Sequence, residues 1–186
     1  MHIEAMTLRT HSLVLLAALI ALFPLTANAA PTDEMFEKLL SAESDEDASR
    51  FEADIWASWF DSDSGTVTVL MDRALVAFQA EDFETTRELL DRVILIAPNY
   101  PEAWNRRAAL FVKNEDYEQA IRDLNEVIKI EPRHFGAWTV LGQVLESLGS
   151  RKEALDAYRE ALKIHPRMEV ARRAVGRLGT TQSRSL

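Results

Sequence analysis

The chain of 186 residues contains no cysteine, and only four histidines, six glycines and six prolines. Without cysteine it can form no disulfide and no thiolate metal site, and no thiol is available as a nucleophile or for lipid attachment. The signatures G-x-x-x-x-G-K-[ST], G-x-G-x-x-G and G-x-S-x-G are absent as well. The sequence therefore gives no sign of a phosphate-binding loop, a dinucleotide site or a serine nucleophile.

Metal and acid-base chemistry have few candidate residues. After residue 29 only His134 and His165 remain, each within two residues of a proline in "EPRHF" and "KIHPR". A zinc site needs three or four converging ligands, so we expect solvent-facing turn histidines instead. The acidic stretch "ESDEDASRFEAD", 43–54, lacks the spacing and the glycine of a calcium loop, and a solvated helix face is the better interpretation. We predict no cofactor, no metal and no enzymatic activity.

The one long apolar run lies near the start of the chain. Arg9 and His11 precede the run 13–23, and "ANA", 27–29, has the small residues of a cleavage site. This pattern predicts a signal peptide over 1–29, cleaved after Ala29. The mature protein would then be periplasmic or secreted.

An uncleaved membrane anchor is the alternative interpretation of this segment. Pro24, Thr26 and Asn28 interrupt the run before it reaches the roughly 20 apolar residues that a spanning helix requires. Nothing further along the chain is apolar enough to span a bilayer. Cleavage therefore remains the favoured prediction, without a membrane span in the mature chain.

Charge is unevenly distributed. Residues 30–65 contain 11 acidic and 2 basic residues, residues 66–149 carry a net charge of -5, and residues 150–186 carry +5. An acidic mature chain without a concentrated basic face is a poor candidate for nucleic-acid binding. The polarity could steer a partner or support head-to-tail self-association, or it could only solvate the surface.

The prolines reveal a period. Pro98, Pro132 and Pro166 are 34 residues apart, and each follows a helical pattern of apolar residues. The stretches 104–132 and 138–166 share this pattern although most of their residues differ. A period of 34 is typical of helix-turn-helix units, and proline ends the second helix of each.

The apolar spacing within a unit predicts two helices. In the second unit Trp104, Ala108 and Phe111 share one face of a first helix. The stripe of the second helix consists of Tyr117, Ala120, Ile121, Leu124, Val127 and Ile128. Asp116 and, in the third unit, Ser150 stand where they could cap the second helices.

These residues resemble the tetratricopeptide repeat (TPR) family. The third unit matches the family's signature positions with Trp138, Leu141, Gly142, Leu145, Ala154, Tyr158, Ala161 and Pro166. The second unit keeps Trp104, Ala108, Phe111, Ala120, Leu124, Val127 and Pro132, but has Arg107 where leucine is commonest. The first unit fits at Leu70, Ala74, Ala77, Leu90, Val93 and Pro98, and departs at Arg73 and Thr86.

The resemblance implies an all-α fold, an α-solenoid that forms a right-handed superhelix. The expected organisation is a signal peptide (1–29), an acidic helical extension (30–65), repeats at 67–100, 101–134 and 135–168 within a repeat region 66–168, a capping helix (169–179) and a disordered tail (180–186). Because end repeats need a cover, we expect the extension to form a helix pair that packs on the first repeat.

In this family the first helices line a concave groove that holds a segment of another protein. The positions carried over are Met71, Leu75, Phe78, Asn105, Arg106, Ala109, Val112, Lys113, Thr139 and Gln143. Met71, Leu75 and Phe78 would offer an apolar patch, unless the N-terminal helix pair covers them. The family's clamp for a chaperone carboxylate is effectively absent, since only Arg106 among its five positions here could take part.

Two functions follow from this interpretation. The first is a non-catalytic adaptor or scaffold of the bacterial cell envelope, with a peptide segment or partner protein bound in the groove. The alternative is a self-assembling structural subunit, a homo-oligomer in which the basic C-terminal end meets the acidic N-terminal helices of a neighbour.

Overall fold

The computed structural model describes residues 30–182, which form nine helices and no strand. Their bounds are α1 Asp33–Leu40, α2 Asp45–Phe60, α3 Gly65–Gln79, α4 Phe83–Ile96, α5 Pro101–Lys113, α6 Tyr117–Ile130, α7 Phe135–Ser147, α8 Arg151–Ile164 and α9 Glu169–Gln182. The all-α prediction is confirmed. The predicted signal peptide (1–29) and the last residues of the predicted tail (183–186) lie outside the described residues.

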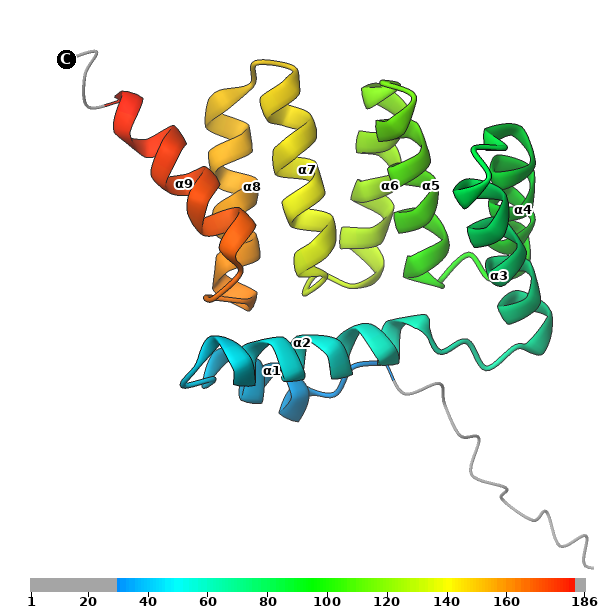
Figure 1. Ribbon diagram of the computed structural model, residues 1–186, viewed down its shortest axis with the longest axis horizontal. Coiled ribbons are helices and arrows are strands. Elements are labelled where there is room, and N and C mark those ends of the chain that lie inside the picture. The colour runs from blue at the N-terminus through cyan, green and yellow to red at the C-terminus, as the bar shows by residue number, and fades with distance from the viewer. Residues whose placement is uncertain (1–29, 183–186) are drawn as a thin grey trace, which may run out of the picture.

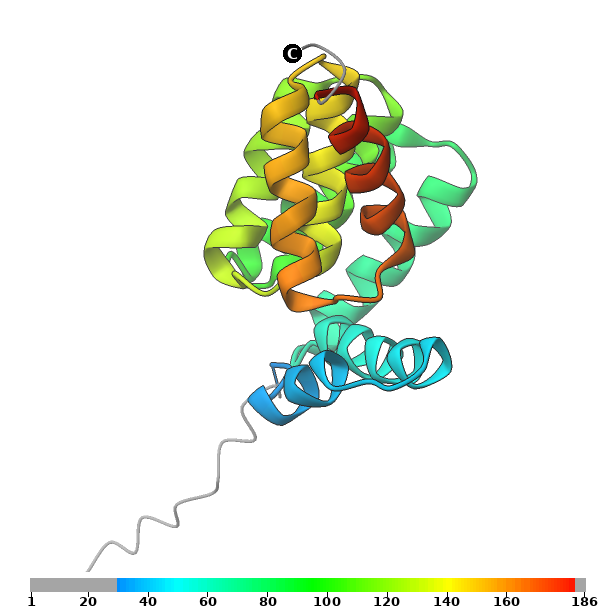
Figure 2. The same ribbon diagram turned by 90° about the vertical axis from the view of Figure 1, so that its left-hand side faces the viewer.

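The helices α3 to α8 form three hairpins that stack side by side, and α9 follows the third (Figure 1). Each hairpin packs against the next through its second helix, α4 on α5 and α6 on α7. Seen from the α9 end, α6 and α8 lie on one side of the stack and α9 on the other (Figure 2). We call the surface formed by the first helices, α3, α5, α7 and α9, the inner surface.

The 34-residue period has a local physical cause at each repeat boundary. The indole Nε1 of Trp104 donates to the carbonyl of Pro98 at 2.9 Å, and Trp138 makes the same bond to Pro132 at 3.0 Å. Tryptophan and proline therefore recur together because one bonds the turn that the other forms.

The turn inside each hairpin is also periodic. Glu81, Glu115 and Gly149 have φ of 57°, 59° and 75°, and they too are 34 residues apart. This left-handed conformation suits glycine and costs other residues energy. Asp116 caps α6 as expected, with the N–H of Gln119 at 3.3 Å from its carboxylate, whereas Ser150 makes no side-chain cap bond to α8.

Arg107, which departs from the family pattern, joins two repeats. Its guanidinium donates two bonds of 2.8 Å to the buried carboxylate of Asp123 on α6. A third bond of 2.6 Å reaches Asp91 on α4 of the preceding hairpin. Burial opposes its charge, but these hydrogen bonds raise the pKa of Arg107. The residue thus replaces an apolar contact with an ionic bridge between α4, α5 and α6.

The N-terminal helix pair does not pack on the first repeat, so that expectation is wrong. Helices α1 and α2 lie across the ends of the later hairpins (Figure 1), and their core cluster includes Phe135, Ile164 and Met168. Ile96 of the first repeat, which corresponds to Ile164, is 52% exposed. The outer side of α3 is likewise left uncovered, since Val76 is 64% exposed.

Two arginines one period apart explain where the pair docks. Arg133 forms an ion pair of 2.6 Å with Asp33, and its guanidinium lies 4.0 Å from the ring centre of Phe36. Arg167 bonds the carboxylate of Asp45 at 2.8 Å and the carbonyl of Ala42 at 2.9 Å. The equivalent residue of the first repeat is Asn99. At this turn position the second and third repeats therefore offer a cation to the acidic helices, and the first repeat does not.

Gly136 provides a sharp test of this docking. A Cβ built at Gly136 would lie 2.7 Å from the ring of Trp56 on α2, whereas one at Gly176 of α9 would meet nothing within 4 Å. We expect Gly136→Ala to lower the free energy of unfolding by about 1 to 3 kcal/mol through overpacking. Gly176→Ala, the control, should raise it by up to about 1 kcal/mol through helix propensity.

Chemical denaturation of both variants checks this prediction. Equal stabilisation by the two alanines would mean that Trp56 does not rest on α7.

Candidate functional site

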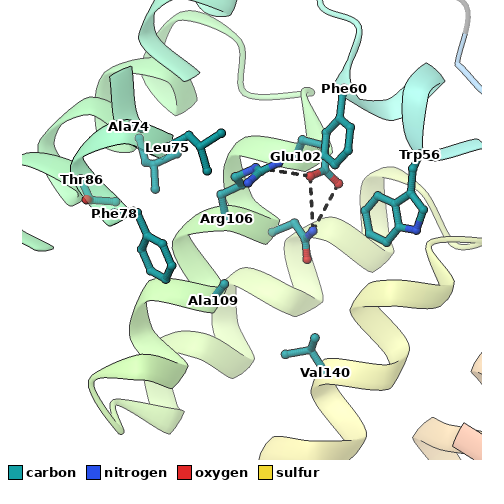
Figure 3. Close-up of a pocket in the computed structure, with 12 residues that line it drawn as sticks. Trp56, Phe60, Ala74, Leu75, Phe78, Thr86, Glu102, Arg106, Ala109 and Val140 are labelled. Carbon is teal, nitrogen blue, oxygen red and sulfur yellow. Dashed lines mark hydrogen bonds and ion pairs between the residues drawn. The ribbon is translucent and has the colours of Figure 1, made fainter. Parts of the chain in front are cut away.

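An apolar pocket of about 280 Å³ opens between α3 and α5 on the inner surface. Its lining comes from five helices and comprises Trp56, Phe60, Ala74, Leu75, Phe78, Thr86, Leu90, Glu102, Asn105, Arg106, Ala109 and Val140. Figure 3 shows Leu75 and Phe78 on one side of the pocket, and Trp56 and Phe60 on the opposite side. The space is large enough for one or two apolar side chains.

The pocket exists because the first helices of the first two repeats are small where they face each other. Ala74 is buried at the centre of α3, and Ala109 of α5 is exposed. Larger residues, Leu75 and Phe78, stand at the rim, and Leu75 is 37% exposed. A cavity with apolar walls and little polar surface favours an apolar group over water.

The floor of the pocket contains a buried carboxylate. Glu102 is 1% exposed, and its Oε1 lies 2.9 Å from Nε2 of His134, which is fully buried. Asn105 donates to the same carboxylate at 3.2 Å. The N–H of Ala137 donates to Nδ1 of His134 at 2.9 Å, so the ring hydrogen is on Nε2 and points to Glu102. The hydrogen-bonded residues Glu102 and His134 fix the start of α7 against α5.

The prediction of solvent-facing histidines is therefore wrong. His134 stacks on Trp59 with ring centres 4.0 Å apart, and His165, 3% exposed, lies 3.1 Å from the carboxylate of Glu52. The hydrogen bond from His165 lowers the pKa of Glu52 despite partial burial. Both rings are buried because α2 covers the repeat-end turns, a packing that the sequence did not indicate.

Arg106 connects the pocket to the N-terminal extension. Its guanidinium lies 4.9 Å from the ring centre of Phe60, and its Nε is 3.9 Å from Glu102. Tyr100, whose pKa is raised by burial and by the charge of Glu102, donates to the carbonyl of Phe60 at 3.1 Å. The last turn of α2 is thus held against α5 at the pocket rim.

Five of the predicted groove residues meet at this pocket: Leu75, Phe78, Asn105, Arg106 and Ala109. Met71 is half-buried and packs on the core of the first repeat instead. Val112 is half-buried against the core between the second and third repeats. Lys113 is exposed, 3.8 Å from Glu81. The N-terminal pair does not cover Leu75, which remains accessible.

The third repeat contributes less than expected. Thr139 is 4% exposed, and its hydroxyl donates to the carbonyl of Phe135 at 2.8 Å. It offers no surface to a ligand, which corrects its assignment to the groove. Gln143 is exposed and lines a second, more polar pocket of about 490 Å³ beside Tyr158, Arg173 and Arg177.

Sequence reasoning missed two contributors to the pocket that come from the extension. Trp56 and Phe60 were expected to cover the first repeat. The aromatic cluster in "FEADIWASWF", 51–60, is the signal for an apolar contact, but it does not say which repeat is contacted.

The described residues hold no group of three or more His, Asp or Glu side chains that could bind a metal ion. Over residues 30–182, no helix has the length and apolar character needed to cross a membrane.

Two family models described as "Tetratricopeptide repeat" match residues 73–134 and 105–169. Together they cover residues 73–169, just over half of the chain. With the stacked hairpins and their periodic residues, this identifies the protein as a member of the tetratricopeptide repeat family. The fold generally serves as a non-catalytic interaction module.

The sequence is similar to that of a TPR repeat-containing protein of Rhizobium etli, with 35% identity over 78 residues. The match covers 42% of this chain and 38% of that relative. The chain therefore matches well under half of the relative's length.

Solved TPR domains share the fold. The first TPR domain of Spaghetti (RPAP3), bound to an HSP90 peptide, superposes with a TM-score of 0.61 at 17% identity, covering 65% of this chain and 96% of that one. The second TPR domain of human RPAP3, in complex with an HSP70 peptide, gives 0.57 at 21% identity, covering 61% and 95%.

Proposed function

We propose that this protein is an adaptor or scaffold that binds a segment of a partner protein on its inner surface. The observation that supports this most is the apolar pocket between α3 and α5, with Leu75 exposed at its rim. The two RPAP3 domains bind peptides, and the same use of the fold is proposed here. No catalytic role is assigned to any residue.

The pocket determines the kind of segment. Its walls favour a branched or aromatic side chain, and Arg106 on α5 adds positive charge beside it. An acidic residue next to an apolar anchor would therefore be attracted to the rim. Chaperone C-termini are not proposed as ligands, because four of the five carboxylate-clamp positions hold no polar side chain.

A photocrosslinking amino acid at Ala109 tests this function in the cells of origin. Ala109 lines the pocket and is exposed, whereas Lys152, exposed on α8, serves as the control position. We expect a partner to be captured from position 109 and not from 152. Arg106→Glu should reduce capture about tenfold, equivalent to ~1.4 kcal/mol.

Equal capture from both positions, unaffected by Arg106→Glu, would place the interaction elsewhere on the protein. Mass spectrometry of the crosslinked product then identifies the partner segment, and its sequence shows whether an apolar anchor next to an acidic residue is present.

The cell envelope is the proposed site of action. The signal-peptide pattern over residues 1–29 supports export, and the similar Rhizobium etli protein is bacterial. N-terminal sequencing of the protein from an envelope fraction should give Ala30 as the first residue. An intact N-terminus in the membrane fraction would favour the anchored alternative.

Self-assembly through the charged ends is the second candidate. The basic residues Arg172 and Arg173 are exposed on α9, which supports it. Asp33 and Asp45 on the acidic helices already pair with Arg133 and Arg167 of the same chain, which leaves less charge for a neighbour. Light scattering at low and high salt distinguishes a monomer from an electrostatic oligomer.

A further inference from the structure

We infer that the α1–α2 helix pair forms part of the binding site. Docking of the helix pair on the repeats and binding of a ligand in the pocket are therefore thermodynamically coupled. This inference rests on the proposed function of the pocket and extends it to residues outside the repeats. The ligand is a partner segment with an apolar anchor and an acidic neighbour.

The first step is geometric. Trp56 and Phe60 stand one turn apart at the end of α2, their rings are stacked with centres 5.5 Å apart, and both line the pocket opposite Leu75 and Phe78 (Figure 3). An anchor side chain in the pocket would touch α2 on one side and α3 on the other. The repeats alone would leave the pocket open on the α2 side.

The second step concerns charge. The guanidinium of Arg106 rests over the ring of Phe60 at 4.9 Å. An arginine above an aromatic ring is held in place by cation–π attraction. Phe60 therefore positions the cation that would meet the acidic neighbour of the anchor, and α2 influences both parts of the recognition.

The third step connects the aromatic wall of the pocket, formed by Trp56 and Phe60, to the contacts that dock the helix pair on the repeats. The indole of Trp56 donates to Glu52 at 3.2 Å, and the other oxygen of Glu52 is 3.1 Å from His165 at the end of α8. Further along, Arg133 bonds Asp33 at the start of α1 and Arg167 bonds Asp45 at the start of α2. The aromatic wall is thus positioned at the pocket rim by Tyr100 and Arg106, and also by contacts with turns of the second and third repeats, away from the pocket.

Docking and binding are coupled because a ligand that touches both the α1–α2 helix pair and the repeats favours the docked state of the helix pair. If the pair is released, the ligand loses the Trp56 and Phe60 contacts and the fixed Arg106. By reciprocity, a bound ligand raises the affinity of the pair for the repeats. Residues far from the pocket then become determinants of affinity.

The four tryptophans allow a direct test, since Trp56 reports the pocket wall, Trp59 the docking contact with His134, and Trp104 and Trp138 the repeats. The protein is labelled with 5-fluorotryptophan, and each ¹⁹F signal is assigned by a Trp→Phe variant. The probe is 1-anilinonaphthalene-8-sulfonate, which combines an apolar aromatic body with an anion.

We expect the probe to shift the Trp56 signal and to leave Trp138 unchanged. Arg133→Ala combined with Arg167→Ala should move the Trp59 signal and weaken probe binding about tenfold. The control pair is Arg122→Ala with Arg159→Ala, two exposed arginines whose ion pairs are with Glu118 and Asp156 of their own helices; it should change neither. Circular dichroism confirms that the repeats stay folded.

A probe that fails to bind, or binds without moving Trp56, would overturn the inference, as would unchanged affinity in a variant whose Trp59 signal has moved. If the arginine variants leave the pair docked, Phe60→Ala provides the decisive measurement, with the same tenfold loss expected. The proposed function fails separately, when Trp56 responds to the probe but crosslinking at Ala109 captures no partner.

Discussion

His134→Ala is expected to lower the free energy of unfolding by about 3 to 5 kcal/mol, because it leaves a buried carboxylate without its main partner. The fully buried ring bonds Glu102 at 2.9 Å, accepts the N–H of Ala137 at the start of α7, and stacks on Trp59. Its removal opens a cavity where three elements, α2, α5 and α7, meet. Thermal or urea unfolding followed by circular dichroism measures the effect.

Glu102→Gln is the matched control for this prediction. The hydrogen on Nε2 of His134 points to Glu102 because Nδ1 accepts a backbone N–H. A glutamine carbonyl can accept the same hydrogen, so the cost should stay below about 1.5 kcal/mol. A loss of stability as large as that of His134→Ala would mean that Glu102 and His134 are held together by charge, contrary to the hydrogen-bond geometry.

Arg107→Leu is expected to be the second most damaging change, although leucine is the commoner residue of the family at this position. The side chain of Asp123 is 4% exposed and accepts two bonds from Arg107. Without them a buried charge is unpaired, at a cost of about 3 kcal/mol. The lost bond to Asp91, which is half-exposed, should add little.

The double variant Arg107→Leu with Asp123→Leu separates this explanation from a loss of packing. Replacing both members of a buried pair with apolar residues is often neutral, so we expect stability within about 1 kcal/mol of the original chain. Urea unfolding of the single and double variants gives the coupling free energy between Arg107 and Asp123. If the double variant is less stable than Arg107→Leu, the ionic bridge is not the reason for the arginine.

The repeat architecture was predictable from the sequence because it is a local property. The prolines at a spacing of 34, the tryptophans that bond their carbonyls, and the small residues at helix contacts all act within about one repeat. Gly142 illustrates this, since a Cβ there would meet the ring of Tyr158 at 2.8 Å within the same hairpin. The capping helix extends further than expected, to Gln182.

The docking of the extension could not be predicted in the same way. It depends on contacts across about 100 residues of sequence, such as Asp33 with Arg133, and acidic helices carry no pattern that names their partner. The 34-residue spacing of Arg133 and Arg167, with Asn99 in the first repeat, was a signal present in the sequence. This signal can be interpreted once the acidic helices are known to pair with basic residues of the repeats.

The candidate site was predicted in part for the same reason. Positions on α3 and α5 follow from the repeat register, which placed Leu75, Phe78 and Arg106 together at the pocket. The assignment of Thr139 to the groove was wrong because its hydroxyl donates to a carbonyl in the preceding turn of its own helix and is covered by Met168. Trp56 and Phe60 belong to the extension, for which no register was available.

A crystal structure of the protein with the segment captured at Ala109 tests the central claim most directly. We expect an apolar side chain of the partner between Leu75 and Phe78 on one side and Trp56 and Phe60 on the other, with an acidic residue beside Arg106. A partner seated on the second helices α4, α6 and α8, with the pocket empty, would contradict the account.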